Sequence, residues 1–149
     1  MTVPEIPPER YLAILDEVES GVYFLDLDRF IKSVNDTRGH EVGDHMLRLV
    51  SGTLRANVRP FDEIARWGGD EFVVVCPNVD LELLTNLGDR LRVLVEKSVV
   101  AREGWIVTAT VSVGATLGLA GDTVESLVAC ADAAMYEAKD GGRNRVAVR

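Results

Sequence analysis

The sequence has few cysteines and no long apolar run, and each shortage excludes a class of protein. Only two of its 149 residues are cysteines. Cys76 and Cys130 lie far apart in apolar stretches, which favours buried free thiols over a disulfide or a metal pair. No apolar run approaches the roughly 18 residues that span a bilayer, and the first residues lack the layout of a secretory signal. We therefore expect a cytoplasmic protein without direct membrane insertion.

Basic residues are also scarce relative to acidic ones. Lys and Arg number 16 against 24 Asp and Glu, so the formal net charge is -8. General binding to nucleic acid draws its affinity from clustered Lys and Arg, and we expect no nucleic-acid partner. A small anionic ligand is compatible with this charge where a metal ion or a few local cations hold it. With 47% apolar residues, the chain is large enough to form one domain without a disulfide or a structural metal.

The first part of the chain predicts a helix, a strand and a second helix. Pro8 suits the first turn of a helix over residues 11–18, and Gly21 is expected to end it. Residues 22–25 are apolar and predict a short buried strand. Apolar side chains recur with the 3.6-residue period over residues 42–54, which predicts an amphipathic helix.

The second part predicts a hairpin, two helices and further strands. Gly68 and Gly69 stand between apolar runs at 64–67 and 72–76, a pattern typical of a β-hairpin. Further along we expect a helix capped by Asp80, one or two strands within 106–117, a helix that stops at Gly141, and a short strand over 145–148. Since strands and helices interleave, we expect an α/β or α+β fold: a mostly antiparallel sheet with helices packed on it.

Carboxylates occur at two places where an apolar strand meets a loop. Asp26 and Asp28 follow the first strand, and Asp70 and Glu71 follow the paired glycines. If the two strands are neighbours, these acids converge, and their repulsion and desolvation destabilise the fold unless a cation binds. Hard divalent cations such as Mg²⁺ take oxygen ligands, commonly one or two carboxylates plus substrate phosphates. Taken alone, each place is also compatible with an ordinary solvated turn.

Four motifs occur together in one order, and they resemble the GGDEF family of diguanylate cyclases from about Val22 to the C-terminus. They are DLDRF at 26–30, NDTRGHEVGD at 35–44, RWGGDEF at 66–72 and AKDGGRNRV at 138–146. The resemblance implies a nucleotide-cyclase or palm-like α+β sandwich, with a central sheet of about five strands flanked by helices and the GGDEF turn on a hairpin. It also implies one GGDEF domain over 1–149, with 21–149 as its core and 1–20 as a divergent, shortened lead-in and helix.

The resemblance implies a role for residues in each motif. Asp26 and Asp70 resemble side-chain ligands of Mg²⁺ or Mn²⁺, with the backbone carbonyl of Leu27 as a further ligand. Glu71, together with Asp70, matches the catalytic position. The implied substrate-binding residues are Asn35, His40 and Asp44 at the guanine and its nucleotide, Phe30, Lys32, Gly68 and Gly69 around the nucleotide, and Lys139 and Arg143 at the triphosphate.

The implied reaction joins two GTP molecules into cyclic di-GMP and releases pyrophosphate. Because each domain holds one GTP, turnover requires a homodimer, at least a transient one. The family also implies a sensory domain in the full-length protein. An RxxD segment, with Arg59 and Asp62, resembles the family's inhibitory product site, to which Arg90 is a candidate third member. A surface salt bridge between Arg59 and Asp62 is the alternative interpretation.

Two departures from the family's pattern keep a second function open. VPEIPPER stands where the family has an LTGLPNR-like segment, and DLDRFIKSVND has one residue more than the usual DxDxFKxxND. We expect a bulge before Asn35 to absorb the extra residue, with Ile31 or Lys32 in place of a phosphate-contacting lysine. The alternative function is a catalytically degenerate domain that binds GTP or cyclic di-GMP as a receptor. Taken singly, His40 could cap a turn, and Lys139 with Arg143 could be a solvated helix end.

Overall fold

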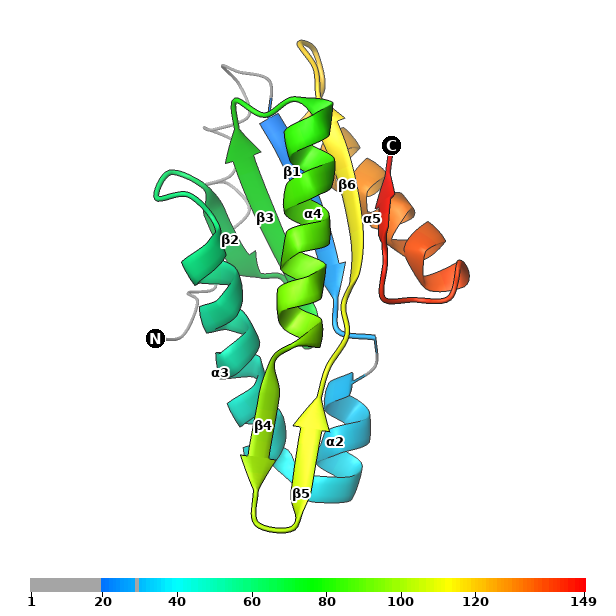
Figure 1. Ribbon diagram of the computed structural model, residues 1–149. Helices are drawn as coiled ribbons and strands as arrows, with labels where there is room; N and C mark the ends of the chain where they lie inside the picture. Colours follow the sequence, from blue (N-terminus) through cyan, green and yellow to red (C-terminus); the bar gives the residue numbers. More distant parts are fainter. Residues whose placement is uncertain (1–19, 29) are drawn as a thin grey trace.

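The structure is a computed structural model that describes residues 20–28 and 30–149, apart from the side chains of residues 30–33. The helix expected over 11–18 lies outside the described residues. The elements, in chain order, are β1 (Ser20–Asp26), α2 (Phe30–Arg38), α3 (His40–Asn57), β2 (Glu63–Arg66), β3 (Glu71–Pro77), α4 (Leu81–Glu96), β4 (Val99–Arg102), β5 (Trp105–Thr108), β6 (Ser112–Gly118), α5 (Val124–Asp140) and β7 (Val146–Val148) (Figure 1).

The central sheet has five strands in the order β2-β3-β1-β6-β7. All neighbours are antiparallel except β6 and β7, which are parallel. The expected α+β fold with a mostly antiparallel sheet of about five strands is therefore confirmed. The expectation that Gly21 ends a helix is wrong. Gly21 is the second residue of β1, because the apolar strand begins earlier, at Ser20.

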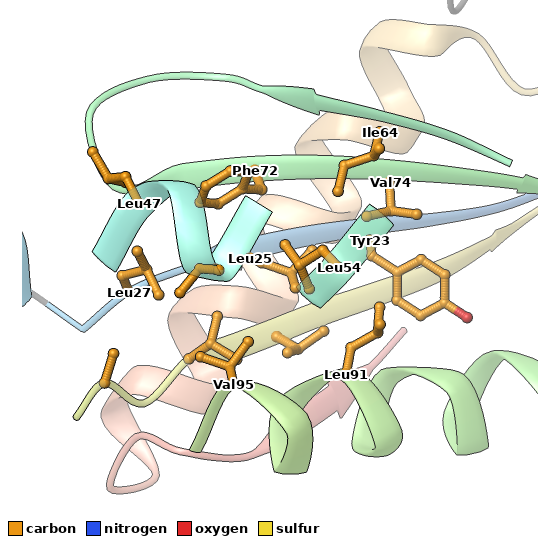
Figure 2. Close-up of a cluster of buried hydrophobic side chains, with 14 of the residues drawn as sticks. Tyr23, Leu25, Leu27, Leu47, Leu54, Ile64, Phe72, Val74, Leu91 and Val95 are labelled. Carbon is orange, nitrogen blue, oxygen red and sulfur yellow. The ribbon is translucent and has the colours of Figure 1, made fainter. Parts of the chain in front are cut away.

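Helices cover both faces of this sheet, so that the described residues form three layers (Figure 1). One core lies between the sheet and α3 with α4, and Figure 2 shows Tyr23, Leu25 and Phe72 from β1 and β3 within it. The Tyr23 hydroxyl donates a hydrogen bond to the carbonyl of Leu84, at 2.8 Å, so this buried polar group is satisfied.

The second core lies between the other face of the sheet and α5. Gly114 in β6 allows α5 to pack closely, because a Cβ there would lie 2.1 Å from both the carbonyl oxygen of Ala131 and the amide nitrogen of Met135. This close approach fixes α5 on the strands, and the C-terminal end of the helix lies where β1 ends.

The expected β2–β3 hairpin is confirmed, with a longer connection than two glycines. β2 ends at Arg66 and β3 begins at Glu71, and the amide of Trp67 donates to the carbonyl of Glu71 at 2.8 Å. The expected cap of α4 is also confirmed, since the Asp80 carboxylate accepts from the amide of Leu83 at 2.8 Å.

Two elements, α2 and β4, were not predicted. α2 follows β1, and β4 pairs with β5 in a separate two-stranded sheet beside α2 and α3 (Figure 1). The stretch 106–117 contributes to two strands, β5 and β6, which belong to different sheets. α5 ends at Asp140, directly before the expected Gly141.

Candidate active site

The end of β1 and the start of β3 lie side by side and bring acidic residues together. Asp26 is paired with Glu71 in the antiparallel register, and the amide of Leu27 donates to the carbonyl of Asp70 at 3.0 Å. Asp26 is only 7% exposed. The predicted convergence of the acids from the two strands is therefore confirmed for Asp26, Asp70 and Glu71.

Leu27 holds this chain segment in place, because its side chain is fully buried in the core beneath α3 (Figure 2). Asp28 does not join the acidic cluster, contrary to expectation. Its backbone has φ of 51°, and its carboxylate accepts hydrogen bonds from the hydroxyls of Thr110, at 2.8 Å, and Ser112, at 2.6 Å. Asp28 thus ties the end of β1 to the start of β6.

Lys139, in the last turn of α5, places a positive charge beside the acidic residues. Its Nζ lies 2.7 Å from Oδ2 of Asp26. The pKa of Glu71 is raised, first by burial and then by the charge of Asp26, and Lys139 acts in the opposite direction and lowers it. Asp132 on α5 and Asp70 raise the pKa of Glu71 further.

A pocket of about 460 Å³ opens next to these acids. It is lined by Asp26, Asn35, Asp36, His40, Gly69, Asp70 and Glu71. It therefore joins residues from the end of β1, the hairpin turn and the junction of α2 with α3. Asp36 was not assigned by the sequence analysis, and its position directly after Asn35 in the NDTRGHEVGD motif is the signal that could have found it.

The paired glycines leave open space at the pocket. Neither Gly68 nor Gly69 has a positive φ, so backbone conformation does not require glycine at either position. A Cβ on Gly69 would meet no atom within 4 Å, and one on Gly68 would meet Oε2 of Glu71 at 3.1 Å. At Gly69, then, neither backbone conformation nor packing within the described chain requires glycine. Close approach of a ligand remains as a reason for it.

Arg66 holds the turn and was missed by the sequence analysis. Its Nε donates to the carbonyls of Gly68 and Gly69 at 3.1 and 3.2 Å, and its Nη2 donates to Gly69 at 2.8 Å. The guanidinium satisfies turn carbonyls that have no strand partner, which orients the loop between β2 and β3. An arginine directly before a glycine-containing turn was the available signal.

The three residues expected at guanine lie on neighbouring helices. Asn35 in α2 and His40 at the start of α3 line the pocket, and Asp44 lies one turn after His40 on α3 and is exposed. The Oδ1 atom of Asn35 is buried and accepts no hydrogen bond from the described part of the chain. Such an unpaired buried acceptor is unfavourable and is a feature of functional sites.

Within residues 30–38 the expected bulge before Asn35 does not occur. α2 is an unbroken α-helix from Phe30 to Arg38, and it keeps Asn35 at the same pocket as Asp26. The side chains of Phe30 and Lys32 lie outside the described residues. Arg143 lies beyond the end of α5, exposed and with φ of 65°, so helical spacing does not place it beside Lys139.

The RxxD residues form a clasp that is more buried than a surface salt bridge. The Asp62 side chain is fully buried, and its carboxylate accepts from the Nη2 of Arg59 at 2.8 Å and from the amide of Arg59 at 2.7 Å. The same Nη2 donates to the carbonyl of Pro77 at 2.7 Å. Arg90 on α4 donates to the carbonyl of Asn57, close by in the chain, so the three expected residues gather around the end of α3.

The donor atoms at the acidic cluster are oxygens, the kind of ligand that a hard divalent cation prefers. Within residues 20–28 and 30–149, no group of three His, Cys, Asp or Glu side chains could enclose a metal ion. Asp26, Asp70 and the Leu27 carbonyl supply oxygen only, and Mg²⁺ commonly takes one or two carboxylates and completes its shell with phosphates and water.

No helix in the described part of the chain is long and apolar enough to cross a bilayer.

Comparison with known proteins agrees with this geometry. The fold is of the α+β nucleotide-cyclase type. It matches the GGDEF domain of DgcB from Caulobacter crescentus in complex with c-di-GMP, with a TM-score of 0.85 and 32% identity over 93% of this chain and 84% of that chain. It also matches the diguanylate cyclase SiaD from Pseudomonas aeruginosa, in complex with its activator SiaC, with a TM-score of 0.88 and 31% identity over 99% of this chain and 59% of that chain.

Sequence comparison gives the family. Residues 11–145 match the family model described as diguanylate cyclase, GGDEF domain. The chain is 44% identical over 126 residues to the response regulator PleD of Caulobacter vibrioides and 40% identical over 127 residues to the diguanylate cyclase DosC of Escherichia coli, covering 82% and 85% of this chain. It therefore belongs to the GGDEF domain family. It spans 27% of the length of each of these two relatives.

Proposed function

We propose that the chain is one GGDEF domain with diguanylate cyclase activity, a nucleotidyltransferase that condenses two GTP into cyclic di-GMP. The observation that carries this proposal is the convergence of Asp26, Asp70 and Glu71 beside Lys139, at the pocket that Asn35 lines. Membership of the GGDEF family and the names of its relatives support the same activity.

The proposed roles are those that the resemblance to the GGDEF family implies for these positions. Asn35, His40 and Asp44 contact the guanine and its nucleotide, Gly68 and Gly69 admit the nucleotide close to the backbone, and Lys139 and Arg143 bind the triphosphate, with Phe30 and Lys32 also assigned to the substrate. Asp26, Asp70 and the carbonyl of Leu27 would hold Mg²⁺ or Mn²⁺. When bound, this cation neutralises charge on the phosphates and on the departing pyrophosphate.

In the proposed reaction, the 3′-hydroxyl oxygen of one GTP forms a bond to the α-phosphorus of the other, and the bond to pyrophosphate breaks. A second identical step closes the ring, so two pyrophosphates leave for each cyclic di-GMP. Glu71 assists the attacking hydroxyl, whose proton its carboxylate can accept, or contacts the metal. Because both nucleotides react symmetrically, two domains face each other in a homodimer.

We propose that cyclic di-GMP also binds at Arg59, Asp62 and Arg90 and inhibits turnover. The Arg59 side chain is 34% exposed although it is bound to Asp62. Its guanidinium carbon lies 4.6 Å from the ring centroid of Phe61, which is itself exposed. A fixed arginine next to an exposed aromatic ring suits the phosphates and flat bases of such a ligand. The full-length protein is proposed to be cytoplasmic and to carry a sensory domain.

A product assay tests the enzymatic function. The protein is incubated with GTP and Mg²⁺ over a range of protein concentrations, since dimerisation is governed by mass action, and the nucleotides are separated. Cyclic di-GMP that forms with wild type and with Glu103→Ala, an exposed control position, but not with Glu71→Ala supports the proposal. Binding of GTP without any product at all concentrations supports the receptor alternative instead.

A further inference from the structure

Gly43 lies directly against the side-chain amide of Asn35, where the first turn of α3 meets α2. A Cβ added to Gly43 would lie 2.2 Å from Oδ1 and 3.2 Å from Cγ of Asn35, both closer than the usual contact of about 3.5–4.0 Å between non-bonded atoms. Gly43 is buried within the helix and does not have a positive φ, so its backbone conformation does not require glycine. The missing side chain therefore makes room for Asn35.

The Asn35 amide is the polar group that benefits from this room. Asn35 lines the pocket, and its Oδ1 is buried without a hydrogen-bond partner in the described residues. An amide offers both a donor and an acceptor. The guanine edge carries an acceptor oxygen beside N–H donors, whereas adenine presents an amino donor where guanine has its oxygen. An amide held in one orientation therefore favours one purine over the other.

We infer that Gly43 is a positioning residue for base selection: by leaving space for the Asn35 amide, it sets the preference of the pocket for guanine over adenine nucleotides. This inference rests on the proposed function, because it takes guanine as the base that Asn35 contacts. Gly43 itself does not line the pocket and acts through Asn35.

The substitution Gly43→Ala tests the inference without loss of the fold. The atoms nearest to the new methyl group are at the end of a flexible side chain, so Asn35 can turn away while the helices stay packed. Alanine also has a higher helix propensity than glycine. Gly52→Ala is the matched control, since Gly52 lies in the same helix and a Cβ there would meet nothing within 4 Å.

Binding is measured by calorimetry with 3′-deoxy-GTP and 3′-deoxy-ATP in the presence of Mg²⁺, because nucleotides without the attacking hydroxyl bind without turnover. We expect Gly43→Ala to weaken binding of 3′-deoxy-GTP by roughly tenfold to a hundredfold, the range for one or two lost hydrogen bonds, with little change for 3′-deoxy-ATP. Gly52→Ala binds both as wild type does. In an Asn35→Ala background, Gly43→Ala has no further effect, because the displaced amide is gone.

The side-chain amide resonances of Asn35, recorded without nucleotide, give an independent readout. They are expected to shift in Gly43→Ala and to stay in place in Gly52→Ala. Unchanged resonances in Gly43→Ala overturn the inference, and so does unchanged selectivity. The inference is also overturned if Gly43→Ala weakens binding in the Asn35→Ala background as much as it does in wild type. If wild type does not prefer 3′-deoxy-GTP, the proposed guanine site fails, and the inference about base selection fails with it even where the resonances shift.

Discussion

The ammonium of Lys139 lies 2.7 Å from Oδ2 of Asp26, and this ion pair joins the last turn of α5 to the last residue of β1. The two side chains are 18% and 10% exposed, so water screens the pair only in part. The pair keeps a cation beside Asp26 and Glu71, and the same ammonium is the one proposed to bind the triphosphate. Lys139 therefore contributes both to stability and to the proposed binding of GTP.

Replacing Lys139 by Met keeps most of the side-chain volume and removes the charge. We expect the free energy of unfolding without divalent cations to fall by about 1–3 kcal/mol, because a largely buried carboxylate loses its partner. Binding of 3′-deoxy-GTP weakens by about tenfold or more, since a charge-assisted contact to phosphate is lost. Urea denaturation and calorimetry measure the two effects. Lys97→Met, at an exposed position, is the control, and equal behaviour of the two variants would contradict this role.

Stability of the metal-free protein depends on pH through Glu71. Its pKa in the folded protein is raised by burial and by Asp26, so the folded state binds a proton at a pH where the unfolded state has released it. This contribution to stability is complete below the unfolded pKa and is lost as pH rises through the folded pKa. Glu71→Gln should therefore gain more stability relative to wild type at pH 7 than at pH 4, in denaturation with a chelator present.

Asp132→Asn provides a second check of the same electrostatics. The charge of Asp132 raises the pKa of Glu71 and the charge of Lys139 lowers it. The Glu71 carboxyl resonance should consequently titrate at lower pH in Asp132→Asn and at higher pH in Lys139→Met. Shifts in the same direction in both variants would show that the charges around Glu71 are arranged differently.

Arg66 should affect turnover more than stability. Its donors hold the carbonyls of Gly68 and Gly69, and Asp70 and Glu71 follow directly. In Arg66→Ala we expect the rate of cyclic di-GMP synthesis to fall on the order of tenfold to a hundredfold, because a displacement of about 1 Å at a reacting group has such an effect. The thermal midpoint should change by only a few degrees. Synthesis at the wild-type rate would show that the turn is held by other contacts.

The arginines of the proposed product site differ in their structural role, and this decides which one to mutate. Arg59→Ala leaves the buried Asp62 carboxylate without its guanidinium and should lower stability by about 2–4 kcal/mol. Arg90 is exposed and donates to one carbonyl, so Arg90→Ala should change stability by less than about 1 kcal/mol. We expect Arg90→Ala to relieve inhibition by cyclic di-GMP at unchanged initial rate. Inhibition as strong as in wild type would exclude Arg90 from the product site.

Much of the fold could be predicted from the sequence where local pattern and tertiary packing agree. The β2–β3 hairpin, the Asp80 cap and the end of α5 were predicted because glycine pairs and caps act within a few residues. The convergence of Asp26 with Glu71 depended on the two strands being neighbours, and the register confirms it.

The rest depended on contacts that no local pattern records. β4 and its partner β5 lie outside the main sheet, and the apolar residues Val99 and Ile106 occupy exposed positions in them. Their sequences therefore lack the apolar–polar alternation of a half-buried strand. Asp26 is the last residue of β1, and Asp28 follows it two residues later. The positive φ of Asp28 directs its carboxylate toward Thr110 and Ser112. The contact of Gly43 with Asn35 arises only when α2 and α3 pack together.

The central claim is that Asp26 and Asp70 together hold a divalent cation with the nucleotide, and binding of Mn²⁺ followed by electron paramagnetic resonance in the presence of 3′-deoxy-GTP tests it most directly. The account predicts tight Mn²⁺ binding that requires the nucleotide and weakens at least about tenfold in Asp26→Asn and in Asp70→Asn. Asp28→Asn, two residues from Asp26 but bound to Thr110 and Ser112, should bind Mn²⁺ as wild type does. Equal binding by all three variants and wild type would contradict the account.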